Sequence, residues 1–208
     1  MEEKTLITKN KKDFKIFDIY DLSEISVKDP GLKSVINLDA KLILRSEGRN
    51  TQKMGSMKVN IVERLMNKLS VAGHRGRKHK VEKGKSTGKY STNMKIVLDA
   101  LKIIENRTKQ NPVQVLVKAV ENSAPRDEIT VIEYGGARYP QAVDVAPLRR
   151  VNMALKHLVH GASDKAFGKK KKYYQTLAEE IILASENNGE SFAIRKRNEA
   201  EKQADSAR

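Results

Sequence analysis

One stretch, residues 125–162, combines two extended runs with a glycine pair between them, in a chain that otherwise reads as helical. The first run, 129–132, consists of β-branched residues, which suit the pleated surface of a strand. Gly135-Gly136 can supply the positive φ that a tight hairpin needs, and a second extended run follows at 139–145. Because Pro140 cannot donate a ladder hydrogen bond, at least one edge of this ribbon stays unpaired.

Helical periodicity surrounds the ribbon on both sides. Apolar residues recur every three to four positions in six segments, which begin near residues 59, 91, 113, 147, 174 and 190. An isolated two-stranded ribbon is marginal in water, so it must rest on these helices or be held by a partner. The pattern predicts a mainly α-helical bundle of about six helices, with a protruding β-hairpin at 128–145 inserted between the third and fourth helices.

The N-terminal part of the chain differs from the rest. Residues 1–56 are polar and contain only short apolar runs, whereas the strong helical signal starts just after them. A length of 208 residues suits one domain with an attachment. We therefore expect a partly irregular N-terminal extension at 1–56 and a helical domain with its hairpin arm at 57–208.

The charge balance points to a polyanionic partner. There are 41 Lys and Arg residues against 26 Asp and Glu, a formal net charge of +15, and self-repulsion at that level opposes compaction. No apolar stretch approaches the ~20 residues of a membrane span, and the charged opening residues give no sign of a secretory signal. The absence of cysteine suits a reducing compartment. We expect a cytoplasmic protein whose first candidate partner is structured nucleic acid, with no membrane and no small-molecule substrate.

The basic residues occur in several separate places. They lie on and before the first helix, in a basic loop at 73–90, at the start of the fourth helix, in the loop after it, and in a triplet of the last helix. We predict RNA contacts from Lys53, Lys58, Asn60, Arg64, Lys68, Arg75, Arg77, Lys78, Lys80, Lys83, Lys85, Lys89, Arg149, Arg150, Lys169, Lys170, Lys171, Lys172, Arg195, Lys196 and Arg197.

Signals for catalysis are weak. Gly84-Lys85-Ser86 is similar to the end of a nucleotide-binding loop, but His79 stands where that motif requires glycine. His157 and His160 could share a metal only with further ligands, which the sequence does not offer. Glu179-Glu180 occupy ordinary helix-surface positions, which favours a solvated face or a local ion pair. We predict no enzymatic activity, no cofactor and no metal site.

Two other function classes stay open. A DNA-binding helical regulator would explain the charge, but no short helix-turn-helix unit is evident. An RNA-processing enzyme would need convergent acidic residues or a metal site. The spread of positive charge over many parts of the chain favours a protein that folded RNA surrounds.

Three passages carry a family resemblance: VNIVERLMNKL at 59–69, NPVQVLVKAVENSAPRDEITVIEYGGARYPQAVDVAPLRRVNMAL at 111–155, and LAEEIILASENNGESFAIRKRNEAEKQADSAR at 177–208. In content and spacing they resemble the S-seven family of small-subunit ribosomal proteins, in its archaeal and eukaryotic-cytosolic form, and the archaeal form is preferred. The resemblance implies a helical bundle bound to ribosomal RNA in the head of the small subunit, which nucleates assembly of the 3′ major domain. It also implies RNA-binding surfaces at 59–69 and 147–150.

The hairpin arm is implied to lie near the exit-site transfer RNA and the outgoing messenger RNA, in a channel completed by neighbouring small-subunit proteins. Carried onto this chain, the residues near the tip are Tyr134, Gly135, Gly136, Arg138 and Tyr139. The ribbon has four acidic residues and Arg138 as its one basic residue. We therefore expect the arm to contact less phosphate than the helices do.

Overall fold

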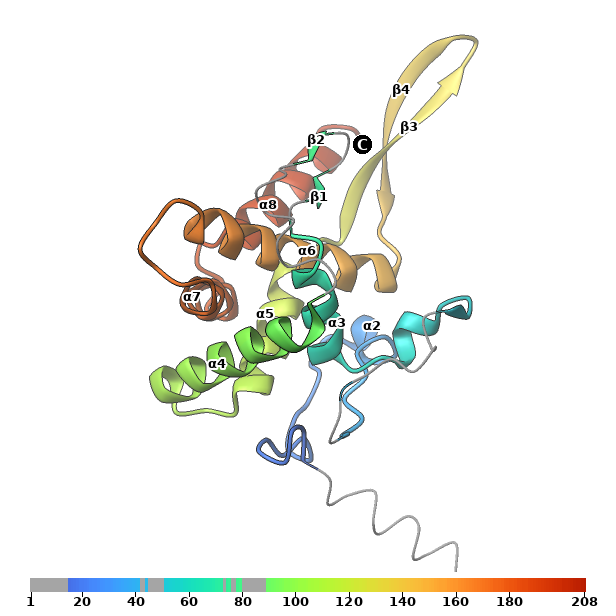
Figure 1. The fold of residues 1–208 in the computed structure, drawn as a ribbon. Helices are drawn as coiled ribbons and strands as arrows, with labels where there is room; N and C mark the ends of the chain where they lie inside the picture. The colour runs from blue at the N-terminus through green and yellow to red at the C-terminus, as the bar shows by residue number, and fades with distance from the viewer. Residues whose placement is uncertain (1–14, 42–43, 45–50, 73, 76–77, 80–88) are drawn as a thin grey trace, which may run out of the picture.

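A computed structural model describes residues 15–41, 44, 51–72, 74–75, 78–79 and 89–208 (Figure 1). Its elements are α2 (Pro30–Lys33), η2 (Gly55–Lys58), α3 (Ile61–Leu69), β1 (His74–Arg75), β2 (Lys78–His79), α4 (Tyr90–Thr108), α5 (Pro112–Ser123), β3 (Asp127–Tyr134), β4 (Ala137–Asp144), α6 (Pro147–Ala166), α7 (Tyr173–Ser185) and α8 (Phe192–Asp205). Within the described ranges, α3 to α8 are the six long helices, and the hairpin lies between the third and fourth of them. The predicted fold class is confirmed.

The hairpin projects well beyond the helices (Figure 1). Strands β3 and β4 pair antiparallel from Asp127↔Asp144 at the base to Tyr134↔Ala137 at the tip. Gly135 and Gly136 form the reversal with φ of 57° and 80°, the left-handed region that glycine adopts without steric cost. The arm therefore stays in place through its base, where it meets α8 and leads into α6.

The core is formed by the apolar faces of the long helices. Helix α5 lies among α4, α6 and α7, and α7 packs against α4 and α6 as well. Fully burying each leucine or isoleucine side chain contributes about 1.5–3 kcal/mol, so this stripe-to-stripe packing is the main source of stability. The largest fully buried side chains of these helices are Ile61, Leu65, Met66, Leu69, Leu101, Ile104, Leu116, Leu155 and Leu158.

The described part of the N-terminal extension packs onto this bundle. It is irregular apart from α2 and the start of η2, yet seven of its apolar side chains join the same core: Ile16, Tyr20, Leu22, Leu32, Val35, Ile36 and Leu44. This segment thus covers helix surfaces that the sequence pattern alone assigns to solvent.

Polar side chains of α5 hold the backbone of residues 21–29. The side chain of Gln114 accepts the N–H of Ser26 at 3.0 Å and donates to its carbonyl oxygen at 3.2 Å. In the last turn of the helix, Glu121 accepts the N–H of Asp29 at 3.0 Å. Backbone groups of an irregular segment need such partners when they leave water, which explains how a chain without regular structure keeps a defined path.

The basic segment at 73–90 is predicted as a loop, and the structure modifies that prediction. His74–Arg75 pairs antiparallel with Lys78–His79, so a minimal two-stranded ladder follows α3. Residues 80–88 lie outside the described ranges. Among the described helices, none combines the length and hydropathy needed to cross a membrane.

Candidate nucleic-acid interface

Seven of the predicted RNA-binding residues are exposed and form no ion pair with another described residue. They lie on or just before η2, just before α4, in the loop between α6 and α7, and on α8: Lys53, Lys58, Lys89, Lys169, Lys170, Lys172 and Arg195. In the view of Figure 1, the α6–α7 loop and η2 lie at opposite ends of the molecule. Their ammonium and guanidinium groups are free to neutralise phosphates approaching from different sides.

Asn60 and Arg64 are predicted as RNA contacts, but both side chains are buried at the start of α3. Asn60 is the N-cap of α3: its side-chain oxygen accepts the N–H of Val62 at 2.9 Å. Arg64 is 5% exposed, and its Nη1 donates to the carbonyl oxygen of Val35 at 3.0 Å. Burial lowers the pKa of Arg64 to about 10. The N-terminal extension covers this face, so neither side chain reaches a phosphate directly.

Arg149 and Arg150, at the start of α6, are both engaged with carboxylates. Two nitrogens of Arg149 contact the two carboxylate oxygens of Glu128 at 2.6 and 2.7 Å, and the hydrogen bond raises the pKa of Arg149. Arg150 donates to Asp29 at 2.9 Å and to the carbonyl oxygen of Pro125 at 3.2 Å. Arg149 remains accessible, because its side chain is 58% exposed, whereas that of Arg150 is 12% exposed. RNA contact stays a prediction for Arg149, and Arg150 has a structural role.

Three further basic residues have partners inside the protein. The contacts are Lys171 to Glu179 at 3.0 Å, Lys196 to Glu199 at 2.6 Å, and Arg197 to the carbonyl oxygen of Asn122 and the side chain of Asn187. Exposed ion pairs contribute at most about 1 kcal/mol, so Lys171 and Lys196 can exchange their carboxylate for a phosphate. Arg197 instead joins α8 to the ends of α5 and α7.

Lys68 is half-buried on α3, and the remaining predicted contacts fall on the basic segment after that helix. Arg75 lies in β1 and Lys78 in β2. Arg77, Lys80, Lys83 and Lys85 lie outside the described residues, so their RNA contacts stay predictions.

The hairpin tip presents aromatic side chains to solvent. Tyr134 is 81% exposed and Tyr139 is 58% exposed. Arg138 lies opposite Glu133 in the ladder, with 3.6 Å between Nε and Oε2, so the arm's basic residue is paired. The tip can stack on a base or an apolar surface more readily than it can neutralise phosphate.

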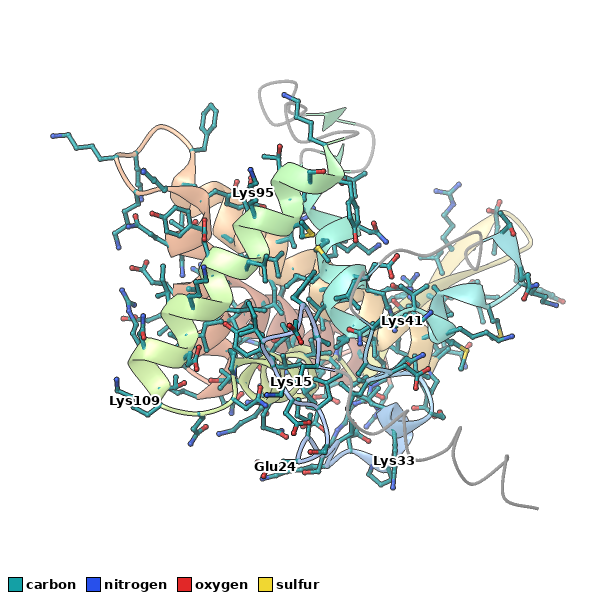
Figure 2. All side chains as sticks on the ribbon, turned by 60° about the horizontal axis from the view of Figure 1, so that its bottom comes forward. Lys15, Glu24, Lys33, Lys41, Lys95 and Lys109 are labelled. Atoms are coloured by element: carbon teal, nitrogen blue, oxygen red, sulfur yellow. The ribbon has the colours of Figure 1, made fainter. Side chains whose placement is uncertain are left out.

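Several further lysines are exposed without belonging to the predicted RNA contacts. Lys95 and Lys102 are exposed on α4 and Lys109 is exposed at its C-cap, and Figure 2 shows Lys95 and Lys109 separated along the helix. Lys156 is exposed on α6. Lys95, Lys102 and Lys109 recur every seven residues, a spacing that predicts one common face of a helix.

The prediction that Glu180 lies on a helix surface is wrong, although a local ion pair is present. Glu180 is fully buried and contacts the Nζ of Lys165 at 2.6 Å. It also accepts the hydroxyl of Ser191 at 2.7 Å and the N–H of Ala193 at 3.2 Å. The carboxylate therefore satisfies donors at the start of α8 and does not face a cleft. Among the described residues, no three acidic or histidine side chains converge in a way that could hold a metal ion.

Comparison with known proteins decides the family. The protein-family model described as ribosomal protein S7p/S5e matches residues 39–208. The chain belongs to this family. Its relatives include the small ribosomal subunit protein uS7 of Nanoarchaeum equitans, 48% identical over 93% of this chain and 98% of the relative, and that of Methanosphaera stadtmanae, 47% identical over the same shares. The uS7 protein of Thermoplasma volcanium is 43% identical over 93% of this chain and all of the relative. The resemblance to the archaeal form of the family is confirmed.

Proposed function

We propose that this S7p/S5e family member is a non-catalytic structural component of the small ribosomal subunit. In this role it binds the head-domain ribosomal RNA directly and nucleates the folding of the 3′ major domain. As a ribosomal protein of archaeal type, it works in the cytoplasm as part of the small subunit, with ribosomal RNA and neighbouring ribosomal proteins as partners.

The observation that carries the proposal is the placement of the unpaired basic side chains. Lys58 lies on η2 with Lys53 shortly before it, Lys169 and Lys170 lie in the α6–α7 loop, and Arg195 lies on α8. In the view of Figure 1, η2 and the α6–α7 loop are at opposite ends of the molecule. RNA helices that converge at a junction repel one another, and a rigid body with cations on several sides lowers that cost. Binding then releases condensed counterions, with a log–log salt slope of roughly 0.7–0.9 per phosphate contacted.

Recognition by shape fits this arrangement better than recognition of base sequence. Side chains cannot enter the deep, narrow major groove of A-form RNA, so contacts fall on phosphates, 2′-hydroxyls and unpaired bases. A helix-turn-helix regulator would concentrate its basic residues around one recognition helix, which these residues do not do.

We propose that the hairpin arm lies near the exit-site transfer RNA and the outgoing messenger RNA, within a channel that other small-subunit proteins complete. The exposed Tyr134 and Tyr139 near the tip support this placement, because an aromatic ring can stack on a nucleotide base or pack on a protein neighbour. The acidic residues along the ribbon make an extended phosphate contact less favourable there than on the helices.

Co-sedimentation tests the proposal. We expect the tagged chain, produced in an archaeal host, to sediment with small ribosomal subunits and to remain bound after a moderate salt wash. In vitro, the purified protein should bind a transcript of the 3′ major domain with 1:1 stoichiometry and should not cleave it when Mg²⁺ is added. Cleavage of the transcript would favour an RNA-processing enzyme, and preference for duplex DNA at the same salt concentration would favour a DNA-binding regulator.

A further inference from the structure

Arg64 of α3 and Asn152 of α6 meet at the seam between the two helices, and each is followed by a lysine on its own helix. The Nη2 of Arg64 lies 3.4 Å from the side-chain oxygen of Asn152, which joins the two helices. Lys68 follows Arg64 by one turn of α3, and Lys156 follows Asn152 by one turn of α6. Each lysine therefore lies one turn beyond the Arg64–Asn152 contact on its own helix.

This group contains three positive charges and no carboxylate. Arg64 is bound by a carbonyl and an amide oxygen, both neutral, and its buried Nε has no hydrogen-bond partner among the described residues. Neither Lys68 nor Lys156 forms an ion pair with another described residue. A buried cation without a counterion is costly, so such clusters require an explanation.

The electrostatics of Lys68 agree with this geometry. Partial burial lowers the pKa of Lys68, and the positive charges of Arg64 and Lys156 lower it further. The charges that act on Lys68 are therefore cations, which places the two ammonium groups within interaction range of each other. An anion between them would relieve the repulsion from both sides.

We infer that Lys68 and Lys156 hold one RNA phosphodiester at the α3–α6 seam, with the buried charge of Arg64 behind them. This subsite deepens the proposed function, because it rests on the chain being an RNA-binding protein. Lys68 is half-buried and Lys156 is exposed, so the phosphate sits partly sheltered from solvent, where a charge contact is screened less than on an open surface.

The test compares two double variants that lose the same charge. The seam variant is Lys68→Gln with Lys156→Gln. The control is Lys95→Gln with Lys109→Gln, exposed lysines on α4 and at its C-cap (Figure 2). The affinity of each protein for a transcript of the 3′ major domain is measured between 0.1 and 0.4 M salt. Loss of one phosphate contact should reduce the salt slope by about 1 and weaken binding about tenfold at 0.15 M for the seam variant, with at most about a threefold change for the control.

Ethylation interference on the same transcript gives an independent readout. Ethylation of one specific backbone phosphate should weaken binding of the wild-type protein and of the control variant. The same ethylation should leave binding of the seam variant unchanged. The single variant Lys156→Gln should produce part of the same change. Because Lys156 is exposed, this substitution should not disturb the fold, so the change cannot come from a folding defect caused by replacing the half-buried Lys68. If the seam variant and the control lose affinity equally and share one interference pattern, the subsite is wrong although RNA binding stands. If the wild-type protein does not bind the transcript at all, the proposed function falls and the subsite falls with it.

Discussion

The guanidinium of Arg150 lies 2.9 Å from the carboxylate of Asp29, although 121 residues separate them in the sequence. Asp29 caps α2 in the N-terminal extension, and Arg150 also donates to the carbonyl oxygen of Pro125, just before the hairpin. Burial raises the pKa of Asp29. The hydrogen bonds from Arg150 and from the N–H of Gly31 together outweigh that effect, so the pKa is lowered. One side chain at the start of α6 therefore fixes the extension and the base of the arm.

Replacing Arg150 should therefore reduce stability before it affects RNA binding. In Arg150→Ala, Asp29 loses its counterion and the carbonyl of Pro125 loses a donor. Hydrogen bonds to charged groups contribute about 1.5–3 kcal/mol each at partly buried sites, so we expect a loss of about 2 kcal/mol in the free energy of unfolding. Urea denaturation followed by circular dichroism should show a midpoint about 1 M lower.

The neighbouring residue provides a matched control. Arg149 also pairs with a carboxylate, that of Glu128, but its side chain is 58% exposed. Since exposed pairs contribute about 0–1 kcal/mol, Arg149→Ala should barely change the midpoint. Equal destabilisation by both substitutions would show that Arg150 has no special structural role.

Substitutions at two adjacent glutamates on α7 should change the free energy of unfolding by very different amounts. Glu180→Ala removes a fully buried carboxylate and leaves Lys165, the hydroxyl of Ser191 and the N–H of Ala193 without their acceptor. Breaking a buried pair in this way costs about 3–5 kcal/mol, so we expect a loss near the lower bound because Lys165 can turn toward water. Urea denaturation measures it.

Glu179→Ala is the control for that substitution, because Glu179 pairs with the exposed Lys171 at the helix surface. Its midpoint should stay within about 0.5 M of the wild-type protein, as expected for an exposed pair. A Glu180→Ala protein as stable as Glu179→Ala would contradict the assignment of Glu180 as the buried anchor of α8.

Local signals in the sequence account for most of the helix and hairpin positions. Asn111 before Pro112 predicts the start of α5, and the structure shows the Asn111 side chain accepting the N–H of Val113 at 3.1 Å. Gly135-Gly136 lie at the reversal of the hairpin, and Pro147 opens α6. These features depend on neighbours within a few residues, so the local pattern contains the information needed to place them.

The errors concern contacts between distant segments. Asn60 and Arg64 lie on the polar stripe of α3, but the extension covers that stripe and binds Arg64 through the carbonyl of Val35. Glu180 looks like a surface residue of α7 until α8 folds back over it. Helical periodicity separates two faces of a helix, but it does not show which later or earlier segment packs on the polar one.

Gly161 on α6 has no room for a methyl group, which gives a third stability prediction. A Cβ there would lie 2.6 Å from the Cβ of Phe192 and 3.0 Å from the carboxylate of Glu180. Overpacking costs about 1–3 kcal/mol, which exceeds the gain of about 1 kcal/mol that alanine brings over glycine inside a helix. We expect Gly161→Ala to lower the melting temperature by several degrees. Gly189→Ala, where a Cβ meets nothing within 4 Å, should leave it unchanged, and a Gly161→Ala protein that melts above the wild type would refute this packing.

His157 should make the stability of the protein depend on pH. Burial, together with the charges of Lys156 and Lys196, lowers its pKa from 6.5 to about 4, against a smaller opposing effect of Glu199. Because the unfolded chain binds the proton more tightly, this contribution is fully present above about pH 6.5 and is lost as the pH falls toward 4. Between pH 7 and pH 5 we expect the free energy of unfolding to fall by about 1–2 kcal/mol, since one pKa unit corresponds to about 1.4 kcal/mol. Urea denaturation at the two pH values should show a clearly smaller fall for His157→Gln, and an identical fall in both proteins would exclude His157 as its source.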